Sequence, residues 1–266
     1  MSELTLPTVP TINVDQSPNN LVIFSKPKTG KTSLLAGLPN CLILDFEKGS
    51  KYVKAMRIHI ESIEDLSKVG KAIKDAAYPY DYIAIDTITA LEDMCVGYAE
   101  ILYSRSPMGK KWFEPDGGKY KYGNILALPE GAGYNWLRQA FTKVVSLIET
   151  FAPRMILSGH IKDIFLGKED SKFSAAELDL TGALKRIVAS KSDSIGYLYR
   201  KGNKTILSFK TVDEVICGAR PEHISNQDII VSEKIGEQLY TYWDKIFLDL
   251  DPQPRAPSEK EVKEKK

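Results

Sequence analysis

Continuous apolar runs alternate along the chain with stretches in which apolar residues recur every three or four positions. The runs are expected to be buried strands, at 21–24, 41–46, 82–86 and 155–158. The helical spacing covers 62–77, 90–102 and 133–150. Strands that are apolar throughout are typical of a parallel sheet covered on both faces. The pattern therefore predicts an α/β fold with a mostly parallel, twisted sheet and helices on both faces.

Two later runs, 195–199 and 205–209, flank the Lys-Gly-Asn-Lys segment 201–204 and predict an antiparallel hairpin at one edge of the sheet. Residues 1–19 are polar, contain three prolines, and are expected to form a flexible lead. Residues 251–266 combine prolines with alternating glutamates and lysines, so we expect a charged, disordered tail, with an interaction tail as the alternative. One domain is then expected over 20–250.

Composition limits the function classes. The chain has 266 residues, of which 43% are hydrophobic and 27% charged, as in ordinary globular proteins. The net charge is +1, so any nucleic-acid site must be a local patch. The three cysteines are far apart and form no metal or redox motif, which predicts reduced thiols. No apolar run reaches transmembrane length, so we expect no membrane partner and a cytoplasmic location.

The segment after the first strand is the strongest motif. It ends in Gly-Lys-Thr and leads directly into an expected helix, which is typical of a phosphate-binding P-loop. Lys31 is expected to reach the β- and γ-phosphates and the Thr32 hydroxyl to bind Mg²⁺. ATP and Mg²⁺ are thus the predicted ligands. The remaining phosphate contacts are expected from backbone N–H groups of the whole segment: Ser25, Lys26, Pro27, Lys28, Thr29, Gly30, Lys31, Thr32 and Ser33.

Two features of the motif leave questions open. The usual first glycine is Ser25 here, which fits only if that position does not need a positive φ. A Gly-Lys-Thr surface turn without any nucleotide is the alternative interpretation.

Polar residues follow three other predicted strands, at the edge where α/β sheets bind ligands. Asp86 comes after four mainly apolar residues and is expected to hold the Mg²⁺ shell, as in a Walker B strand. Glu47 is expected to orient or deprotonate the attacking water. His160 is placed beside the γ-phosphate, where it could report phosphate occupancy to nearby loops. For each residue, the alternative is a polar side chain that only ends its strand.

These segments resemble the RecA family over about residues 20–215. The resemblance is carried by Asp45-Phe46-Glu47, by Ile85-Asp86-Thr87 with Ala90-Leu91, by His160-Ile161-Lys162, and by 180–185 (Leu-Thr-Gly-Ala-Leu-Lys). It implies that Glu47 is the catalytic glutamate and that His160 stands where a switch glutamine is usual. We expect no counterpart of the extra terminal domains of RecA. It is most similar to the short RecA-core annealing and recombination proteins of bacteriophages, which implies the host cytoplasm as the location.

Two segments, 104–132 and 163–179, are too long to be ordinary connections. In the RecA family such loops line a DNA channel. Basic residues interleaved with aromatics suit single strands, because lysines meet phosphates and rings stack on bases. The alternative for the first segment is that its aromatics pack in a satellite core, and the second also carries acids. The candidate DNA-binding residues are Lys110, Lys111, Trp112, Lys119, Tyr120, Lys121, Lys185 and Arg186.

The resemblance also implies a homo-oligomer, a ring or filament, in which a cation from the neighbour completes the ATP site. Lys210 and Arg220 are the candidates, and both could equally be solvated surface charges. The sequence thus predicts an ATP-binding and hydrolysing protein of recombination or strand annealing. Single-stranded DNA is its expected partner, with a single-strand-binding protein as a further candidate.

Three alternatives stay open. A ring translocase or helicase-like motor would share every active-site residue. A nucleotide-gated binding protein would show little turnover. A P-loop small-molecule kinase is disfavoured, because such enzymes close an arginine-rich lid and the only arginines between Arg57 and Arg154 are Arg105 and Arg138.

Overall fold

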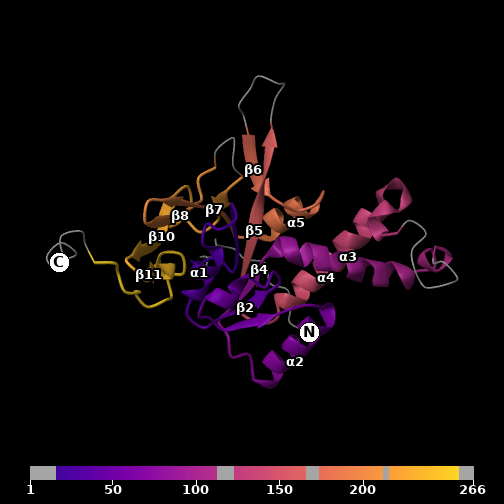
Figure 1. The fold of residues 1–266 in the computed structure, drawn as a ribbon, viewed down its shortest axis with the longest axis horizontal. Coiled ribbons are helices and arrows are strands. Elements are labelled where there is room, and N and C mark those ends of the chain that lie inside the picture. The colour runs from indigo at the N-terminus through magenta and orange to yellow at the C-terminus, as the bar shows by residue number, and fades with distance from the viewer. Residues whose placement is uncertain (1–15, 113–122, 166–173, 212–215, 258–266) are drawn as a thin grey trace, which may run out of the picture.

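The computed structural model describes residues 16–112, 123–165, 174–211 and 216–257. A central twisted sheet is flanked by helices in an α/β arrangement (Figure 1). The helices are α1 (Lys31–Ala36), α2 (Ile63–Asp75), α3 (Ile88–Ser104), α4 (Ala132–Ile148) and α5 (Leu184–Lys191), with short 3-10 turns η1 (Gly49–Tyr52), η2 (Gly109–Lys111), η3 (Ile125–Ala127), η4 (Pro129–Gly131) and η5 (Trp243–Lys245).

The sheet has the strand order β11-β10-β8-β7-β1-β5-β4-β2-β3, while β6 pairs with β5 and β9 with β7. Pairing is parallel from β7 through β3 and antiparallel from β7 through β11. The strands are β1 (Asn20–Ser25), β2 (Cys41–Asp45), β3 (Arg57–His59), β4 (Tyr82–Asp86), β5 (Arg154–Phe165), β6 (Ser174–Leu178), β7 (Ser194–Lys201), β8 (Lys204–Ser208), β9 (Gly218–Ala219), β10 (Asp228–Ile235) and β11 (Gln238–Thr241). The predicted fold class is confirmed. The hairpin of β7 and β8, which was expected at one edge, adjoins the parallel strands, and β10 and β11 extend the sheet beyond it.

Both faces of the sheet are covered, but by different parts of the chain. Alternate residues of a strand point to opposite faces, so Val22 and Phe24 join one core cluster while Leu21 and Ile23 join another. The first cluster packs against α2, α3, α4 and α5. The second packs against α1 and the segment that contains Trp243. The strands between these layers are therefore apolar throughout.

The long strand β5 differs from the prediction. It was expected over 155–158 but continues past His160 to Phe165, where it pairs antiparallel with β6. Much of the segment 163–179, expected as a loop, is therefore a β-hairpin. Its base is held by apolar packing, since Ile161 pairs with Leu178, which is buried in the core. Residues 166–173, with Lys168 and Lys172, lie outside the described residues.

The two ends of the expected domain are also held by contacts. The Ser17 hydroxyl accepts from the Leu248 amide at 2.9 Å, and the Gln253 side chain donates to the Gly37 carbonyl at 3.2 Å. Ser17 and Gln253, which the sequence analysis assigned to the lead and to the tail, thus make contacts with the rest of the chain. Residues 1–15 and 258–266 lie outside the described residues.

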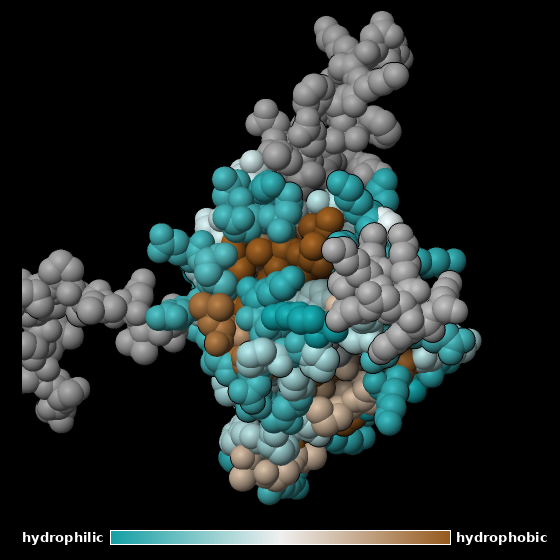
Figure 2. Space-filling model, turned by 90° about the vertical axis from the view of Figure 1, so that its left-hand side faces the viewer, coloured by the Kyte–Doolittle hydropathy of each residue, from teal (hydrophilic) through white to brown (hydrophobic). Residues whose placement is uncertain are grey.

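Hydrophilic residues cover most of the side formed by the antiparallel strands. Hydrophobic residues gather in one larger area in the upper half of this face and in smaller areas elsewhere (Figure 2). No helix within the described ranges has both the length and the apolar character that a membrane span requires.

Candidate nucleotide-binding site

Strand register places the predicted site residues along one edge of the sheet. Asp86 of β4 pairs with Asp45 of β2 on one side and with Ser158 of β5 on the other. Ser25, the last residue of β1, pairs with His160 of β5. Because these strands are parallel, their carboxyl ends meet at the same edge, where α/β folds bind ligands. Residues far apart in the sequence are brought together there.

The segment between β1 and α1 has the backbone that a phosphate loop needs. Ser25 is fully buried and is not among the positive-φ residues, so serine fits where the usual motif has glycine. Gly30 has a φ of 108°, in the left-handed region that favours glycine. Helix α1 begins at the next residue, Lys31. The loop therefore turns into α1 at the motif's glycine.

Lys31 is buried beneath this loop, with 7% of its surface exposed. Its Nζ lies 3.2 Å from Ser25 Oγ and 3.4 Å from His160 Nδ1. Burial lowers the pKa of Lys31, and the carboxylates of Asp86 and Glu47 act in the opposite direction. An ammonium held this way has no carboxylate in direct contact among the described residues, so a phosphate group is a fitting partner.

Thr32 and Asp86 form the predicted metal position. Thr32 Oγ1 donates to Asp86 Oδ2, and Ser158 Oγ donates to Asp86 Oδ1, each at 2.6 Å. The described residues contain no group of three or more histidine, cysteine or acidic side chains that could hold a metal by themselves. Mg²⁺ is commonly held by one or two protein oxygens together with substrate phosphates. A hydroxyl beside a carboxylate, next to a phosphate loop, fits that ion.

Glu47 lies beside this position and is held by two side chains. Its Oε1 accepts from the Thr87 hydroxyl and lies 3.1 Å from His160 Nε2. A neutral imidazole with its proton on Nε2 can donate to Glu47 and accept from Lys31 at Nδ1. His160 therefore bridges Lys31, the candidate phosphate ligand, and Glu47, the candidate catalytic carboxylate. With 38% of its side chain exposed, Glu47 is also accessible to water.

The turn that carries Glu47 is fixed by the buried carboxylate of Asp45. Asp45 accepts from the Glu47 amide at 3.0 Å and from the Ser50 amide at 3.1 Å. Burial acts to raise the pKa of Asp45, but the hydrogen bonds from Ser50 and Glu47 outweigh it and hold that pKa below its usual value. Asp45 thus positions the turn and has no direct part in the site.

The comparison with protein families agrees with this geometry. The family model described as AAA domain matches residues 17–221, which include β1, the P-loop, β4 and β5. The chain belongs to the AAA domain family. Together with the P-loop edge, this match identifies a RecA-like P-loop ATPase fold.

Two solved structures are also similar to this chain. The KaiC-like protein PH0186 from Pyrococcus horikoshii OT3 has 12% identity and a TM-score of 0.42, with 84% of this chain and 89% of that chain covered. The RadB recombinase has 10% identity and a TM-score of 0.39, with 84% and 90% covered. The search of curated proteins finds no significant match.

The P-loop and the carboxyl ends of β1, β4 and β5 together form the nucleotide edge of this AAA domain. Hydrogen bonds connect this edge to the base of the β5–β6 hairpin. The His160 carbonyl accepts from the Asp179 amide at 2.9 Å, and Thr89 Oγ1 donates to the Asp179 carbonyl at 3.3 Å. One turn further along α3, both oxygens of Glu92 accept from the Thr181 amide at 3.1 Å. Burial raises the pKa of Glu92, and these hydrogen bonds oppose it. The helix that follows Asp86 is therefore bonded to residues 179–181.

A groove of about 150 Å³ lies next to this connection, between the start of α4 and the segment 181–184. Tyr134 and Arg138 line it from one face of α4, four residues apart. Tyr134 is 50% exposed, and the Arg138 guanidinium donates to Asn135 Oδ1 at 2.6 Å. The sequence prediction did not include these two residues, although an aromatic and a basic residue one turn apart was a usable signal.

The predicted DNA-binding residues have different environments. Lys110 and Lys111 are exposed on η2, and Arg186 is exposed on α5. Trp112 packs against the main hydrophobic core, which favours the satellite-core alternative for that side chain. The Lys185 ammonium forms an ion pair with Glu177. The other candidates, Lys119, Tyr120 and Lys121, lie outside the described residues.

The cations considered for a neighbouring subunit's site are engaged within their own chain. Lys210 Nζ lies 2.6 Å from Asp228, and Arg220 Nη1 lies 2.9 Å from Asp193. A different cation stands at the P-loop itself. Arg200 Nη2 lies 3.1 Å from the position that a Cβ on Gly30 would take. The sequence analysis did not single out Arg200, because an arginine near a hairpin turn is common on protein surfaces.

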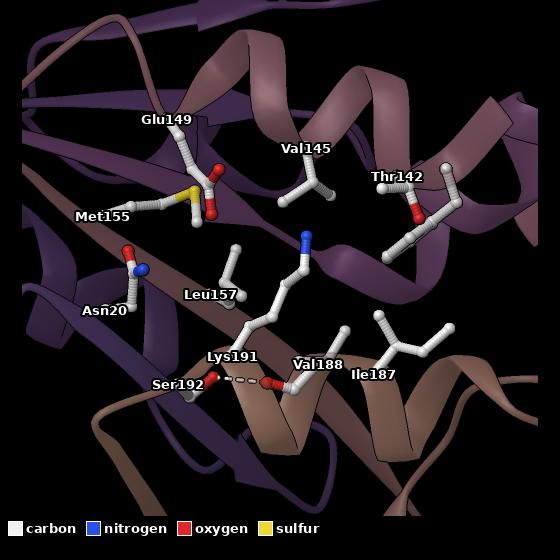
Figure 3. Close-up of a pocket in the computed structure, with 11 residues that line it drawn as sticks. Asn20, Thr142, Val145, Glu149, Met155, Leu157, Ile187, Val188, Lys191 and Ser192 are labelled. Atoms are coloured by element: carbon white, nitrogen blue, oxygen red, sulfur yellow. Dashed lines mark hydrogen bonds between the residues drawn. The ribbon is translucent and has the colours of Figure 1, made fainter. Parts of the chain in front are cut away.

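A second cavity, of about 20 Å³, lies between α4 and α5 (Figure 3). It is lined by Asn20 and Met155, which stand at the amino ends of β1 and β5, and the Lys191 side chain points into it. The P-loop occupies the opposite, carboxyl ends of these strands. This cavity is therefore separate from the nucleotide edge and too small for a nucleotide.

Proposed function

We propose that this AAA domain protein hydrolyses ATP and binds single-stranded DNA in recombination or strand annealing, and that the bound nucleotide sets its DNA affinity. The observation that carries the proposal is the hydrogen-bonded path from His160 to Asp179 and from Glu92 to Thr181. This path joins the nucleotide edge to the groove beside Tyr134 and Arg138. Two ligand sites that share a bonded element can influence each other's affinity.

At the nucleotide edge each side chain has a distinct task. The backbone amides of the loop and Lys31 bind the phosphates, and Thr32 with Asp86 would hold Mg²⁺. When bound, that ion neutralises charge on the β- and γ-phosphate oxygens. Glu47, fixed by Thr87 and His160 yet open to solvent, orients the attacking water. This division of roles supports hydrolysis and not nucleotide binding alone.

At the groove, the chemistry suits an unpaired strand. The exposed Tyr134 ring can stack on a base, and Arg138 one turn later can meet a phosphate. Stacking tolerates any base, because every base has a π-face. A single strand therefore fits better than a duplex, whose bases are already stacked. The exposed Lys110 and Lys111 add positive charge on the segment that precedes α4.

His160 is the residue through which we expect the two sites to communicate. Its ring contacts Lys31 and Glu47, and its backbone bonds to Asp179 at the hairpin base. A phosphate oxygen that attracts the Lys31 ammonium or the His160 ring changes the contacts on the ring. The backbone of the same residue would transmit this change to Asp179. Nucleotide occupancy would then bias the segment 179–181 that lines the groove.

The test is ATP turnover, measured without nucleic acid and with single-stranded DNA, duplex DNA or RNA, together with DNA affinity in ATP-analogue and ADP states. We expect single strands to stimulate turnover most and the two states to differ about tenfold in DNA affinity. His160→Ala should remove that difference while both ligands still bind. His223→Ala, on the antiparallel side of the sheet, is the control. Turnover that no nucleic acid affects, or steady duplex unwinding, would contradict the proposal.

A further inference from the structure

We infer that Arg200 binds the phosphates of the nucleotide held by its own chain. This inference rests on the proposed ATP site and adds a contact that the P-loop motif does not contain. Its starting point is the distance between Arg200 Nη2 and the Cβ position of Gly30, 3.1 Å. The guanidinium therefore stands directly over the residue where the phosphate loop turns into α1.

The strand register explains how this arginine reaches the loop. Strand β7 runs parallel to β1, with Tyr197 paired to Phe24. Arg200 lies three residues beyond Tyr197, past the end of β1, at the level where the chain has already turned into the P-loop. The hairpin partner β8 pairs Thr205 with Arg200 and fixes the strand there. The approach thus follows from sheet topology and does not depend on a mobile loop.

The guanidinium also has no competing partner. Within the described ranges its side chain makes no hydrogen bond and no ion pair, in contrast to Lys210 and Arg220, which are both paired. An exposed arginine without an acidic neighbour keeps all five N–H donors available. Arginine suits phosphate, because its planar fork can donate two parallel hydrogen bonds.

The side from which Arg200 approaches identifies the part of the nucleotide it contacts. In the sheet, β1 lies between β7 and β5. Asp86 ends β4 and Glu47 follows β2, so both residues, which face the γ-phosphate in the proposed site, lie on the β5 side of β1. His160 on β5 contacts Lys31. Arg200 comes from the β7 side. It should therefore bind the phosphates nearer the nucleoside, which ATP and ADP share, and act as a positioning residue that binds both nucleotides alike.

The experiment measures ATP and ADP affinity and steady-state turnover for wild type, Arg200→Ala and Arg200→Lys. A charge-assisted contact of this kind is expected to be worth about 10- to 100-fold in affinity. Arg200→Ala should weaken ATP and ADP equally and raise KM, with kcat nearly unchanged, since the contact is the same throughout the reaction. Arg200→Lys should recover part of the affinity. Lys201→Ala, the next exposed cation on β7, is the matched control and should bind as wild type does.

Two further measurements separate the alternatives. Lys31→Ala tests the ATP site itself. If it abolishes binding while Arg200→Ala changes neither affinity, only the role of Arg200 is overturned. A fall in kcat with unchanged ADP affinity would place the guanidinium at the γ-phosphate and also contradict the inference. Mixing Arg200→Ala with Lys31→Ala chains tests whether the contact is made within one chain. Restored affinity on mixing would mean that Arg200 reaches a neighbour's P-loop, and the same-chain contact would be wrong.

Discussion

The nucleotide edge and the groove at α4 differ in what holds their side chains in place. At the edge, Lys31 and Asp86 are nearly buried, and their positions follow from the register of parallel strands. At the groove, Tyr134 and Arg138 are exposed on a helix, and their neighbours come from a segment fixed by Glu92. Changes at the edge should therefore act on chemistry and be large, whereas changes at the groove should act on affinity and be moderate.

The largest effect is expected at Lys31. Lys31→Ala should abolish ATP binding, because it removes the only cation buried beneath the loop among the described residues. The fold should survive, since burial lowers the pKa of this lysine and its charge is costly in the folded chain. Calorimetric titration and a thermal melt check the two parts. Lys68→Ala on the exposed face of α2 is the control. Wild-type ATP affinity in the variant would remove the P-loop interpretation.

Glu47→Gln should have the second-largest effect. Turnover should fall by about 10²- to 10⁴-fold, while ATP binding is preserved. Glutamine keeps an oxygen for the Thr87 hydroxyl and for His160, but it cannot take a proton from water. Single-turnover hydrolysis measures the chemical step directly. Glu61→Gln, also exposed and next to a histidine, is the matched control. A kcat within a fewfold of wild type would show that Glu47 only ends its strand.

Moderate effects are expected at the groove. Tyr134→Ala should weaken single-strand binding by about 1–3 kcal/mol if the ring stacks on a base. Arg138→Ala should reduce the slope of log affinity against log salt by about 0.7, as one lost phosphate contact does. Trp112→Ala is the contrast: its ring packs on the core, so the variant should lose about 1–3 kcal/mol of stability and keep its DNA affinity. The reverse result would move the DNA contact to the segment around Trp112.

The smallest effect is expected at Glu92, whose carboxylate accepts from the Thr181 amide and so connects α3 to the groove. Burial raises the pKa of Glu92 in the folded chain, so its contribution to stability is complete below the unfolded pKa and is lost as pH rises through the folded pKa. Glu92→Gln keeps an acceptor for Thr181 and never ionises. As the pH rises from 4 to 8, the melting temperature of the variant should increase relative to that of wild type, on the order of a few degrees. Glu222→Gln, which is exposed, should show no such trend.

The comparison also explains how far the sequence could predict the molecule. The runs that became β1, β2 and β4 are fully buried, so an uninterrupted apolar pattern was enough to find them. The sequence also predicted that the P-loop, Asp86 and Glu47 lie at one edge of the sheet, because strand ends in a parallel sheet converge there. Their roles stay predictions. Strand β6 was not predicted, because its small and polar residues form a strand only through their pairing with β5. Arg200 was missed for a related reason, since its place depends on the register of β7 against β1.

The short helix α1 depends on the far end of the sequence. Trp243 Nε1 donates to the Leu34 carbonyl at 2.9 Å, and the side chains of Thr241 and Gln253 both donate to the Gly37 carbonyl at 3.2 Å. The last carbonyls of a helix need donors from outside it. Here the Leu34 carbonyl also accepts from the Gly37 amide, and residues more than 200 positions later supply the further donors. Proteins are synthesised from the amino end. A growing chain on the ribosome thus carries its whole phosphate loop long before it can anchor the helix behind that loop, and tight ATP binding should begin only after Gln253 has left the exit tunnel.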